Sequence, residues 1–433
     1  MRLSTFRGAA LASLSLLACA ASGAAQEVAA SSTTLTLEQR VEALERRVPP
    51  TAPAPPWTRH GFWLSAPNRA DFRLRLGGVL QSDDRAFLTA APNGADEFLV
   101  RRARIYVEGV IQDHIEFRIL PDFASGQSLL QEAWVDFNDL PELRLQAGKM
   151  KAPLSLERLV ADVDTLFVER GLPQDIAPNR DVGAQLHGQL FNRRAEYALA
   201  VVNGAADGAS DDADSDNNKD FVGRLFLTPF RGSGPALFED LGVGMAGSYG
   251  RQRDGGAAGL PAYSSEAQLP FFSYLTGVAA AGERERLMPQ AYWYAGPFGV
   301  LGEYVSSSQQ VAKGAASTTL TNRAWQAAAS WVLTGEKRAY EGVKPKTNFD
   351  PKNRGWGAFE LAGRYSALWI DRAAFPVYAS PTASARRADA ESAGLNWYLN
   401  GNVRVAVDYL RTVYAGGPRY LEQAVFSRVQ LSF

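Results

Sequence analysis

The chain has 433 residues, of which 21% are charged, and its formal net charge at pH 7 is −1. This balance, without a basic tract, gives no indication of a nucleic-acid-binding protein, and no segment approaches the roughly 18 consecutive apolar residues of a transmembrane helix. The 39 glycines and 11% aromatic residues instead accompany many short segments in which apolar and polar residues alternate. Such alternation is typical of a membrane β-barrel, in which every second side chain faces lipid.

The amino-terminal segment has the layout of a secretory signal peptide. Arg2 and Arg7 precede an apolar stretch from Ala9 to Ala21, and small residues follow through Ala25. A basic start, a short apolar region and a small-residue cleavage zone define such a signal. We therefore expect residues 1–25 to be removed on export, together with the single cysteine. That cysteine also ends a loose lipoprotein-type site, although a spanning barrel needs no lipid anchor.

Two small segments are expected between the signal and the barrel. A 4-3-4 spacing, as in a short heptad seam, relates Leu37, Val41, Leu44 and Val48. Because so short a seam cannot hold a coiled coil by itself, residues 26–48 form either a lone periplasmic helix or, if the barrel is oligomeric, a short trimeric coiled coil. Residues 49–71 begin with PPTAPAPP and are predicted to be a stiff, extended linker.

From Phe72 to the carboxyl terminus, the sequence predicts sixteen strands. They span approximately 72–80, 98–111, 114–123, 129–138, 143–151, 182–191, 195–203, 220–230, 241–252, 285–296, 298–311, 322–334, 357–370, 389–399, 402–413 and 422–433. In the second strand, for example, Arg102 and Arg104 share one face and Ile105 lies on the other. The predicted fold is therefore all-β, a sixteen-stranded antiparallel transmembrane barrel over residues 72–433 with a water-filled lumen, because unpaired charges are costly in a dry core.

The connections between these strands alternate between short turns and long loops, as in outer-membrane barrels with periplasmic turns. The short turns are Gln112-Asp113, 138–142, Asn192-Arg193, Gly296-Pro297 and Asn400-Gly401. One connection does not fit, because the segment 335–356 is long although its parity makes it periplasmic. It is either a genuine long turn or a sign that the strand count slips there.

The last predicted strand ends at Phe433, with Val429 and Leu431 on the same face. In a soluble domain this strand edge would face water, whereas a closed membrane barrel pairs its last strand with its first. Bacterial outer-membrane barrels resemble this chain here, because their assembly machinery reads a terminal strand that ends in Phe after alternating apolar residues. We therefore expect the chain to lie in the bacterial outer membrane, with membrane lipid and the barrel assembly machinery as partners.

Three stretches resemble the phosphate-selective porin O and P family. They are FLVRRARIYVEG (98–109), GKMKAPLSLERL with FVERGLPQDIAPNRDVGAQLHG (148–159 and 167–188), and SWVLTGEKRAY with GWGAFELAGRYSAL (330–340 and 355–368). Family members are sixteen-stranded trimeric channels that pass anions passively, some of them selective for phosphate or polyphosphate. The resemblance implies a homotrimer that conducts phosphate or other small anions by diffusion and needs no cofactor.

The connection from Ala152 to Asp181 is the candidate pore constriction, because the corresponding loop of sixteen-stranded porins folds inward. Its candidate residues for contact with anions are Arg158, Arg170 and Arg180, together with Lys149 and Lys151, which lead into the loop. Arg102 and Arg104 project to one face about 7 Å apart, followed on that face by Tyr106. Guanidinium groups at this spacing can pass an anion along without holding it tightly. Alternatively, these arginines pair with lumen carboxylates and keep the wall rigid.

The predicted lumen is nearly balanced in charge. By strand parity its arginines are Arg102, Arg104, Arg118, Arg144, Arg224, Arg364, Arg404 and Arg428. Its acidic residues are Glu108, Glu116, Glu132, Asp136, Glu303, Glu360 and Asp408. A dedicated phosphate channel would be expected to carry a more one-sided basic surface, so the sequence predicts a weak anion preference at most.

Other functions are less well supported. The acidic stretch 207–220 has Asn217 where an EF-hand loop needs Gly and no closing Glu, so we expect a solvated loop and no metal site. No nucleophile motif surrounds any serine, and an enzyme is not expected. The alternative from another class is a non-conducting adhesin or envelope-tethering barrel that works through its amino-terminal helix. Deletion of residues 35–56 would abolish the phenotype of a tether and leave the conductance of a porin.

Overall fold

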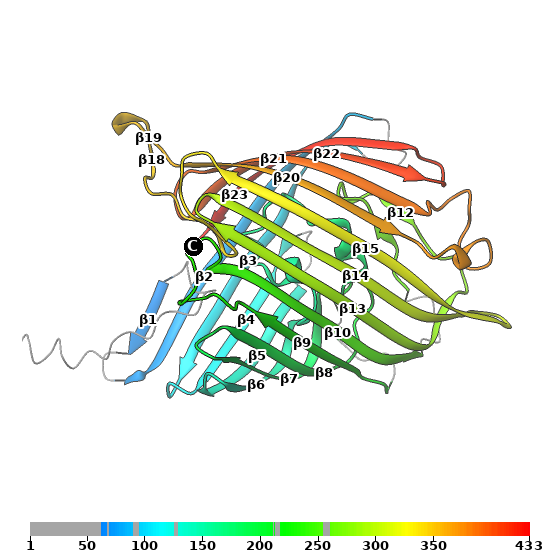
Figure 1. The fold of residues 1–433 in the computed structure, drawn as a ribbon, viewed down its shortest axis with the longest axis horizontal. Helices are drawn as coiled ribbons and strands as arrows, with labels where there is room; N and C mark the ends of the chain where they lie inside the picture. The colour runs from blue at the N-terminus through cyan, green and yellow to red at the C-terminus, as the bar shows by residue number, and fades with distance from the viewer. Residues whose placement is uncertain are drawn as a thin grey trace, which may run out of the picture. The chain divides into compact units, whose positions relative to one another are not determined.

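The computed structural model describes residues 62–66, 69–89, 95–124, 129–210, 212, 217–253 and 260–433. The predicted signal peptide, the amino-terminal helix and most of the linker lie outside these residues and remain predictions. Within the described part, sixteen strands form a closed antiparallel barrel (Figure 1). No helix in this part is long and apolar enough to cross a membrane.

The strands of the barrel wall follow one another in chain order. They are β2 (Arg69–Phe87), β3 (Glu97–Ile111), β4 (Ile115–Asp122), β5 (Leu129–Leu140), β6 (Leu143–Lys151), β7 (Arg180–Leu190), β8 (Ala195–Val202), β9 (Asp220–Leu227), β10 (Asp240–Arg253), β13 (Ala279–Ala295), β14 (Phe298–Lys313), β15 (Ala316–Val332), β20 (Ala358–Trp369), β21 (Arg387–Tyr398), β22 (Val403–Ala415) and β23 (Leu421–Ser432). Each pairs with the next, and β23 pairs with β2. The predicted number and order of wall strands are therefore confirmed.

Some strand ends differ from the prediction. The strand β2 runs to Phe87 because Gln81, Asp83 and Arg85 continue its inward, buried face, although their polarity is typical of a loop. The short strand β1 (Phe62–Ala66) pairs with the first half of β2 and lies in the segment predicted as linker. Arg180 is the first residue of β7 and not part of the preceding loop.

The two faces of the wall have opposite polarity, as predicted. Large apolar side chains on the outer face are exposed, among them Leu80 at 46%, Ile105 at 49% and Leu199 at 58%. On the inner face, charged side chains such as Arg428 and Asp83 are almost fully buried and form an ion pair with an Nε–Oδ1 distance of 2.6 Å. An apolar exterior around a polar interior is the arrangement that a barrel in lipid requires.

Backbone pairing at the carboxyl terminus closes the barrel. Phe433 N donates to Gly78 O at 3.1 Å, and Gly78 N donates to Phe433 O at 2.9 Å. A Cβ on Gly78 would lie only 2.6 Å from the Phe433 ring, so the close approach requires glycine. Val429 and Leu431 are exposed on the outer face, which agrees with the predicted pattern of the terminal strand. Recognition by the assembly machinery remains a prediction.

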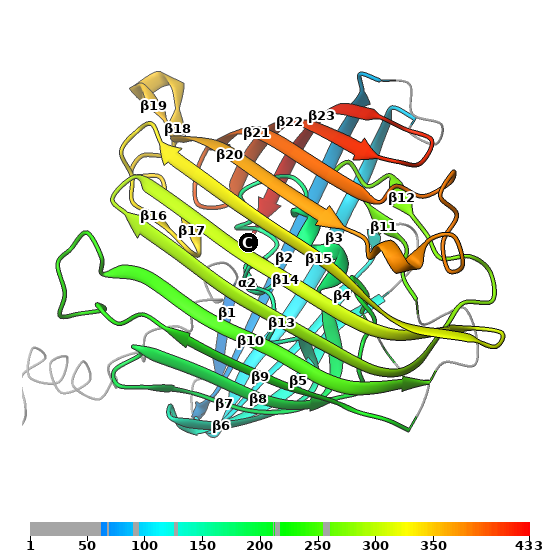
Figure 2. The ribbon, with the colours of Figure 1, turned by 45° about the vertical axis from the view of Figure 1, so that its right-hand side comes forward.

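The connections agree with the predicted alternation of short turns and long loops except between β14 and β15, where residues 314–315 form a two-residue turn in place of the expected long loop. Gln112 and Asp113 have φ values of 53° and 58°, as the two central residues of a type I′ hairpin turn require. The connection 333–357, between the neighbouring strands β15 and β20, is a genuine long connection, so the strand count does not slip. It contains β16 (Arg338–Ala339), β17 (Gly342–Val343), β18 (Phe349–Asp350), η4 (Pro351–Asn353) and β19 (Gly355–Trp356). It lies at the end of the barrel that holds the carboxyl terminus (Figure 1), where β15 ends and β20 begins (Figure 2). This is the periplasmic end by the short-turn rule.

Two connections fold into the lumen. Residues 152–179, which we call the constriction loop, contain α2 (Leu156–Leu159) and η2 (Leu172–Ile176), and η2 contacts β14, β15 and β20. Residues 260–278 contain β11 (Tyr263–Ser264) and β12 (Pro270–Phe272), and we call them the inner connection. Leu154, Leu172 and Ile176 of the first pack in one apolar cluster with Phe271 and Phe272 of the second. One side of the lumen is therefore filled with packed side chains.

Replacement of Gly78 with Leu should weaken the closing seam, because the new side chain would occupy the space of the Phe433 ring. Overpacking of this kind lowers the free energy of unfolding by roughly 1–3 kcal/mol. Denaturant unfolding in detergent micelles, followed by tryptophan fluorescence, measures the loss. Gly363→Leu is the matched control, because no atom lies within 4 Å of a Cβ built there. Equal stability of the two variants would contradict the role of the seam.

Candidate pore constriction

A buried carboxylate on the wall holds both arms of the constriction loop. Glu303 of β14 accepts hydrogen bonds from Ser155 Oγ at 2.9 Å and Leu156 N at 2.8 Å. It also accepts one from Gln174 Nε2 at 2.9 Å, which comes from the returning arm. On the opposite wall, Lys151 Nζ donates to the carbonyl oxygen of Val160 at 2.8 Å. The loop is thus anchored from two sides of the barrel.

A cavity of about 480 Å³ lies between the constriction loop, the inner connection and the wall formed by β3 to β7. Its cationic lining is Arg101, Arg102, Arg104, Lys149, Arg158, Arg170 and Arg180. Its acidic lining is Asp122, Asp162, Glu169, Asp175, Asp212 and Glu266. Cationic and acidic groups therefore face one another across a space large enough for water and small solutes.

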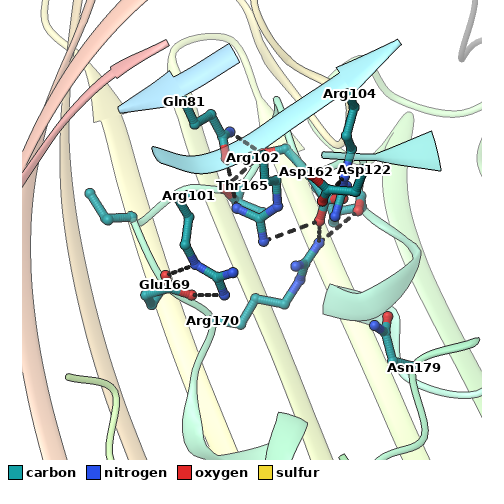
Figure 3. A network of polar contacts seen from close by, with 12 residues as sticks. Gln81, Arg101, Arg102, Arg104, Asp122, Asp162, Thr165, Glu169, Arg170 and Asn179 are labelled. Atoms are coloured by element: carbon teal, nitrogen blue, oxygen red, sulfur yellow. Dashed lines mark hydrogen bonds and ion pairs between the residues drawn. The ribbon is translucent and has the colours of Figure 1, made fainter. Parts of the chain in front are cut away.

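Asp162, on the constriction loop, gathers four arginines from three parts of the chain. Figure 3 shows three of them, Arg102, Arg104 and Arg170. It is bonded by Arg104 Nη1, lies 2.8 Å from Arg170 Nη2, and is 3.7 Å from both Arg102 Nη2 and Arg180 Nη2. Burial by itself would raise the pKa of Asp162, but the surrounding arginines hold it well below its usual range. The carboxylate is therefore ionised and draws these guanidinium groups together.

Glu169 forms a second such centre at the same loop. It accepts from Arg101 through Nε at 2.6 Å and Nη2 at 3.2 Å, and from Arg85 Nη2 at 3.0 Å. Arg428 Nη2 lies 3.6 Å away. Burial opposes ionisation here too, yet Arg101 and the other arginines lower the pKa of Glu169. Two loop carboxylates thus position the arginines of β2, β3 and β23.

Arg101 is the site residue that sequence alternation misses, because strict alternation places it toward lipid. In the register of β2 and β3, Gln81 pairs with Arg102 and Ser82 pairs with Val100. Arg101 is therefore the extra residue of a β-bulge, which redirects its side chain to Glu169. The available signal was the Arg101-Arg102 pair itself, since one of two consecutive arginines would otherwise face hydrocarbon at high cost.

The structure places six of the eight predicted constriction residues on the cavity: Arg102, Arg104, Lys149, Arg158, Arg170 and Arg180. Lys151 instead anchors the constriction loop. Tyr106 lies near the carboxyl terminus, where its hydroxyl accepts from Arg75 Nη2 at 3.0 Å and donates to Phe433 O at 3.1 Å. It lies off the cavity because it is farther along β3 toward the periplasmic end than Arg104.

Most of the cavity arginines form ion pairs with carboxylates of the wall or the constriction loop. From the sequence, such pairing was the alternative to a role in contacting anions. Arg104 Nε lies 2.7 Å from Asp122, and Arg180 Nη2 lies 2.9 Å from Glu132. The arginines that form these ion pairs also line the cavity. A structural role in the wall and contact with passing anions are therefore compatible for the same side chains.

Asp175 differs from the other acidic lining residues. It forms no ion pair within the described residues. Its carboxylate accepts a hydrogen bond from Ser264 N of the inner connection at 2.9 Å. Burial raises the pKa of Asp175 to about 8, although that hydrogen bond and Arg158 act in the opposite direction. At pH 7 the group is mostly neutral, so the seven cationic side chains face five other carboxyl groups.

The described residues contain no group of three or more His, Cys, Asp or Glu arranged to hold a metal ion. Residues 211 and 213–216 of the acidic stretch 207–220 lie outside the described part. Its described ends hold wall arginines, since Asp207 lies 2.8 Å from Arg286 Nε and Asp220 lies 2.8 Å from Arg284 Nη2.

Comparison with known proteins agrees with this architecture. The family described as phosphate-selective porin O and P matches residues 74–419. Porin O of Pseudomonas aeruginosa is 26% identical over 386 residues, which cover 82% of this chain and 86% of that protein. The family is described as one of porins, which are channels.

Two solved structures share the fold at low identity. The outer membrane channel DcaP of Acinetobacter baumannii is 9% identical, with a TM-score of 0.59 over 86% of this chain and 100% of that one. The anion-selective porin from Comamonas acidovorans is also 9% identical, with a TM-score of 0.52 over 84% of this chain and 100% of that one. Since the family match spans most of the sequence and the wall closes as a sixteen-stranded barrel, the chain belongs to the phosphate-selective porin O and P family and is a channel of the bacterial outer membrane.

Proposed function

We propose that this porin passes small hydrophilic anions, phosphate or polyphosphate among them, by passive diffusion and with a weak preference over cations. The observation that carries the proposal is the cavity beside the constriction loop, where cationic side chains outnumber acidic ones. The names of two similar proteins, Porin O and an anion-selective porin, point in the same direction.

The cavity arginines have donors to spare for a passing anion. A guanidinium group carries five N–H donors, and the two loop carboxylates are each shared among several arginines. Arg101, for example, uses Nε and Nη2 on Glu169, and its Nη1 bonds no other group in the described part of the chain. Spare donors around a wet space can replace part of the hydration shell of an anion.

The same carboxylates explain why the preference should be weak. Asp162 and Glu169 already neutralise much of the arginine charge, so an anion meets donors without being trapped. Conduction requires binding that is favourable enough for entry and weak enough for release. A short polyphosphate would contact several cationic side chains at once. No covalent step and no cofactor is needed for such passage.

Single-channel conductance in a planar bilayer under a KCl gradient tests the proposal. Steps in groups of three are expected from the homotrimer that the family resemblance implies. The reversal potential should favour chloride, and added phosphate should reduce the current. Steps without ion preference would leave a general porin, whereas folded protein without conductance would favour the adhesin or tether alternative.

Replacement of both Arg101 and Arg102 with Gln should shift the reversal potential toward potassium. A unit charge about 4 Å from a monovalent anion contributes about 1 kcal/mol even in water, which is a factor of about five, so the loss of two charges should lower the chloride-to-potassium permeability ratio by at least about fivefold. Arg251→Gln is the matched control, because Arg251 is exposed, with 58% of its side-chain surface accessible, and does not line the cavity. An equal shift in the control would contradict a role for the cavity arginines.

Anion preference should also fall as the pH rises through about 8. Below that pH the Asp175 carboxyl is mostly protonated and neutral, and above it the group adds a negative charge to the cavity. Reversal potentials between pH 6 and pH 10 measure the effect. Asp175→Asn should keep the low-pH selectivity across the whole range. A profile in this variant identical to that of the unaltered protein would assign the pH dependence to other groups.

A further inference from the structure

A strongly basic hairpin projects from the periplasmic connection. Residues 344–356, which we call the basic hairpin, contain β18, η4 and β19 and expose Lys344, Lys346, Lys352 and Arg354. Within the described part of the chain, none of these four cations has a carboxylate at ion-pair distance. Just before the hairpin, by contrast, Lys337 Nζ lies 2.7 Å from Asp240 Oδ2. The charge of the hairpin is therefore open to an external partner.

The one acidic residue of the hairpin has a local structural role. The carboxylate of Asp350 caps η4 by accepting from Lys352 N at 3.1 Å and Asn353 N at 3.3 Å. It also accepts from Asn353 Nδ2 at 2.6 Å. Its hydrogen bonds therefore go to backbone and amide groups, and within the described residues it forms no ion pair with the four cationic side chains.

Arg354 occupies a backbone conformation that favours glycine. It ends η4 with φ at 59° and ψ at 26°, in the left-handed region. Gly or Asn adopts this conformation at lower cost than a long side chain does.

Aromatic packing places the hairpin against the outer face of the barrel at the periplasmic boundary of the membrane. Trp397 Nε1 of β21 donates to Trp356 O at 2.7 Å, and the Phe349 ring meets the Trp397 ring edge-on at 5.1 Å. Phe359 of β20 stacks on Trp397 at 5.6 Å. Farther round the wall, Phe298 and Trp331 stack at 5.9 Å. Such a row of aromatic residues marks the headgroup level of a membrane barrel.

We propose that the basic hairpin binds the headgroups of anionic phospholipids in the periplasmic leaflet of the outer membrane. Lysine and arginine donate to phosphate oxygens, and basic residues next to a membrane surface are attracted to anionic lipid. A lipid partner fits better than a solute of the pore, because none of the four cations lines the cavity. It also fits better than a soluble partner, because the aromatic contacts hold the hairpin beside the lipid-facing wall. Leu361 and Leu395 are exposed on that wall.

Native mass spectrometry of the purified full-length protein in detergent tests the proposal with two probes, phosphatidylglycerol and phosphatidylcholine. Each basic residue near an anionic surface contributes about a fivefold gain in binding. We therefore expect the unaltered protein to prefer phosphatidylglycerol by more than about tenfold, with the preference screened by 0.5 M salt. The variant K344Q/K346Q/K352Q/R354Q should lose the preference. Unaltered single-channel conductance of this variant establishes that its barrel is folded.

The matched control is R251Q/R323Q/R387Q/R411Q, which removes the same number of charges from exposed or half-buried arginines of the wall, away from the hairpin. This control should retain the lipid preference. Loss of the preference in both variants would overturn the proposal in favour of non-specific charge, and its persistence in the hairpin variant would overturn it outright. Hairpin-dependent sedimentation with peptidoglycan, without any lipid preference, would also overturn it and would assign the hairpin to the cell wall.

Discussion

The whole structure depends on the need to pair every backbone N–H and C=O group within a membrane that offers no water. A sheet meets this need only if it closes, because an open edge would leave a row of unpaired groups in hydrocarbon. Here closure rests on the β2–β23 pairing and on the mutual hydrogen bonds of Gly78 and Phe433. Once the sheet is closed, alternation along each strand separates an apolar exterior from an enclosed polar interior.

Enclosure then sets the second constraint, which is the pairing of charges. Burial of an uncompensated charge costs several kcal/mol, and the inner face carries many arginines. The constriction loop supplies Asp162 and Glu169 to these arginines, and Glu303 on the opposite wall holds the loop in place. The position of the constriction loop therefore sets the positions of the arginine side chains that pair with it. The same arrangement limits how strongly the cavity can favour anions, because most of its guanidinium groups already have a nearby carboxylate.

Much of the fold could be predicted from the sequence because a barrel strand repeats every two residues. The order of the wall strands, the inward face of Arg102 and Arg104, and the closure at Phe433 all follow from that period. Strand ends were less predictable. The sequence predicts a loop at Asp83 and Arg85, because both are charged and nothing nearby in the sequence indicates that they are buried. Their partners, Arg428 and Glu169, are distant in the sequence and become neighbours only when the barrel closes.

The sequence by itself determined the class of the protein, its strand count and the segment that enters the lumen, because these depend on local alternation and on recognisable stretches of residues. Only the tertiary structure decided which side chains meet at the cavity. The bulge at Arg101, the shared use of Asp162 and the separation of Tyr106 from the cavity depend on strand register and on a loop that crosses the lumen. Register and loop packing are set by contacts between residues far apart in the chain, which no local pattern records.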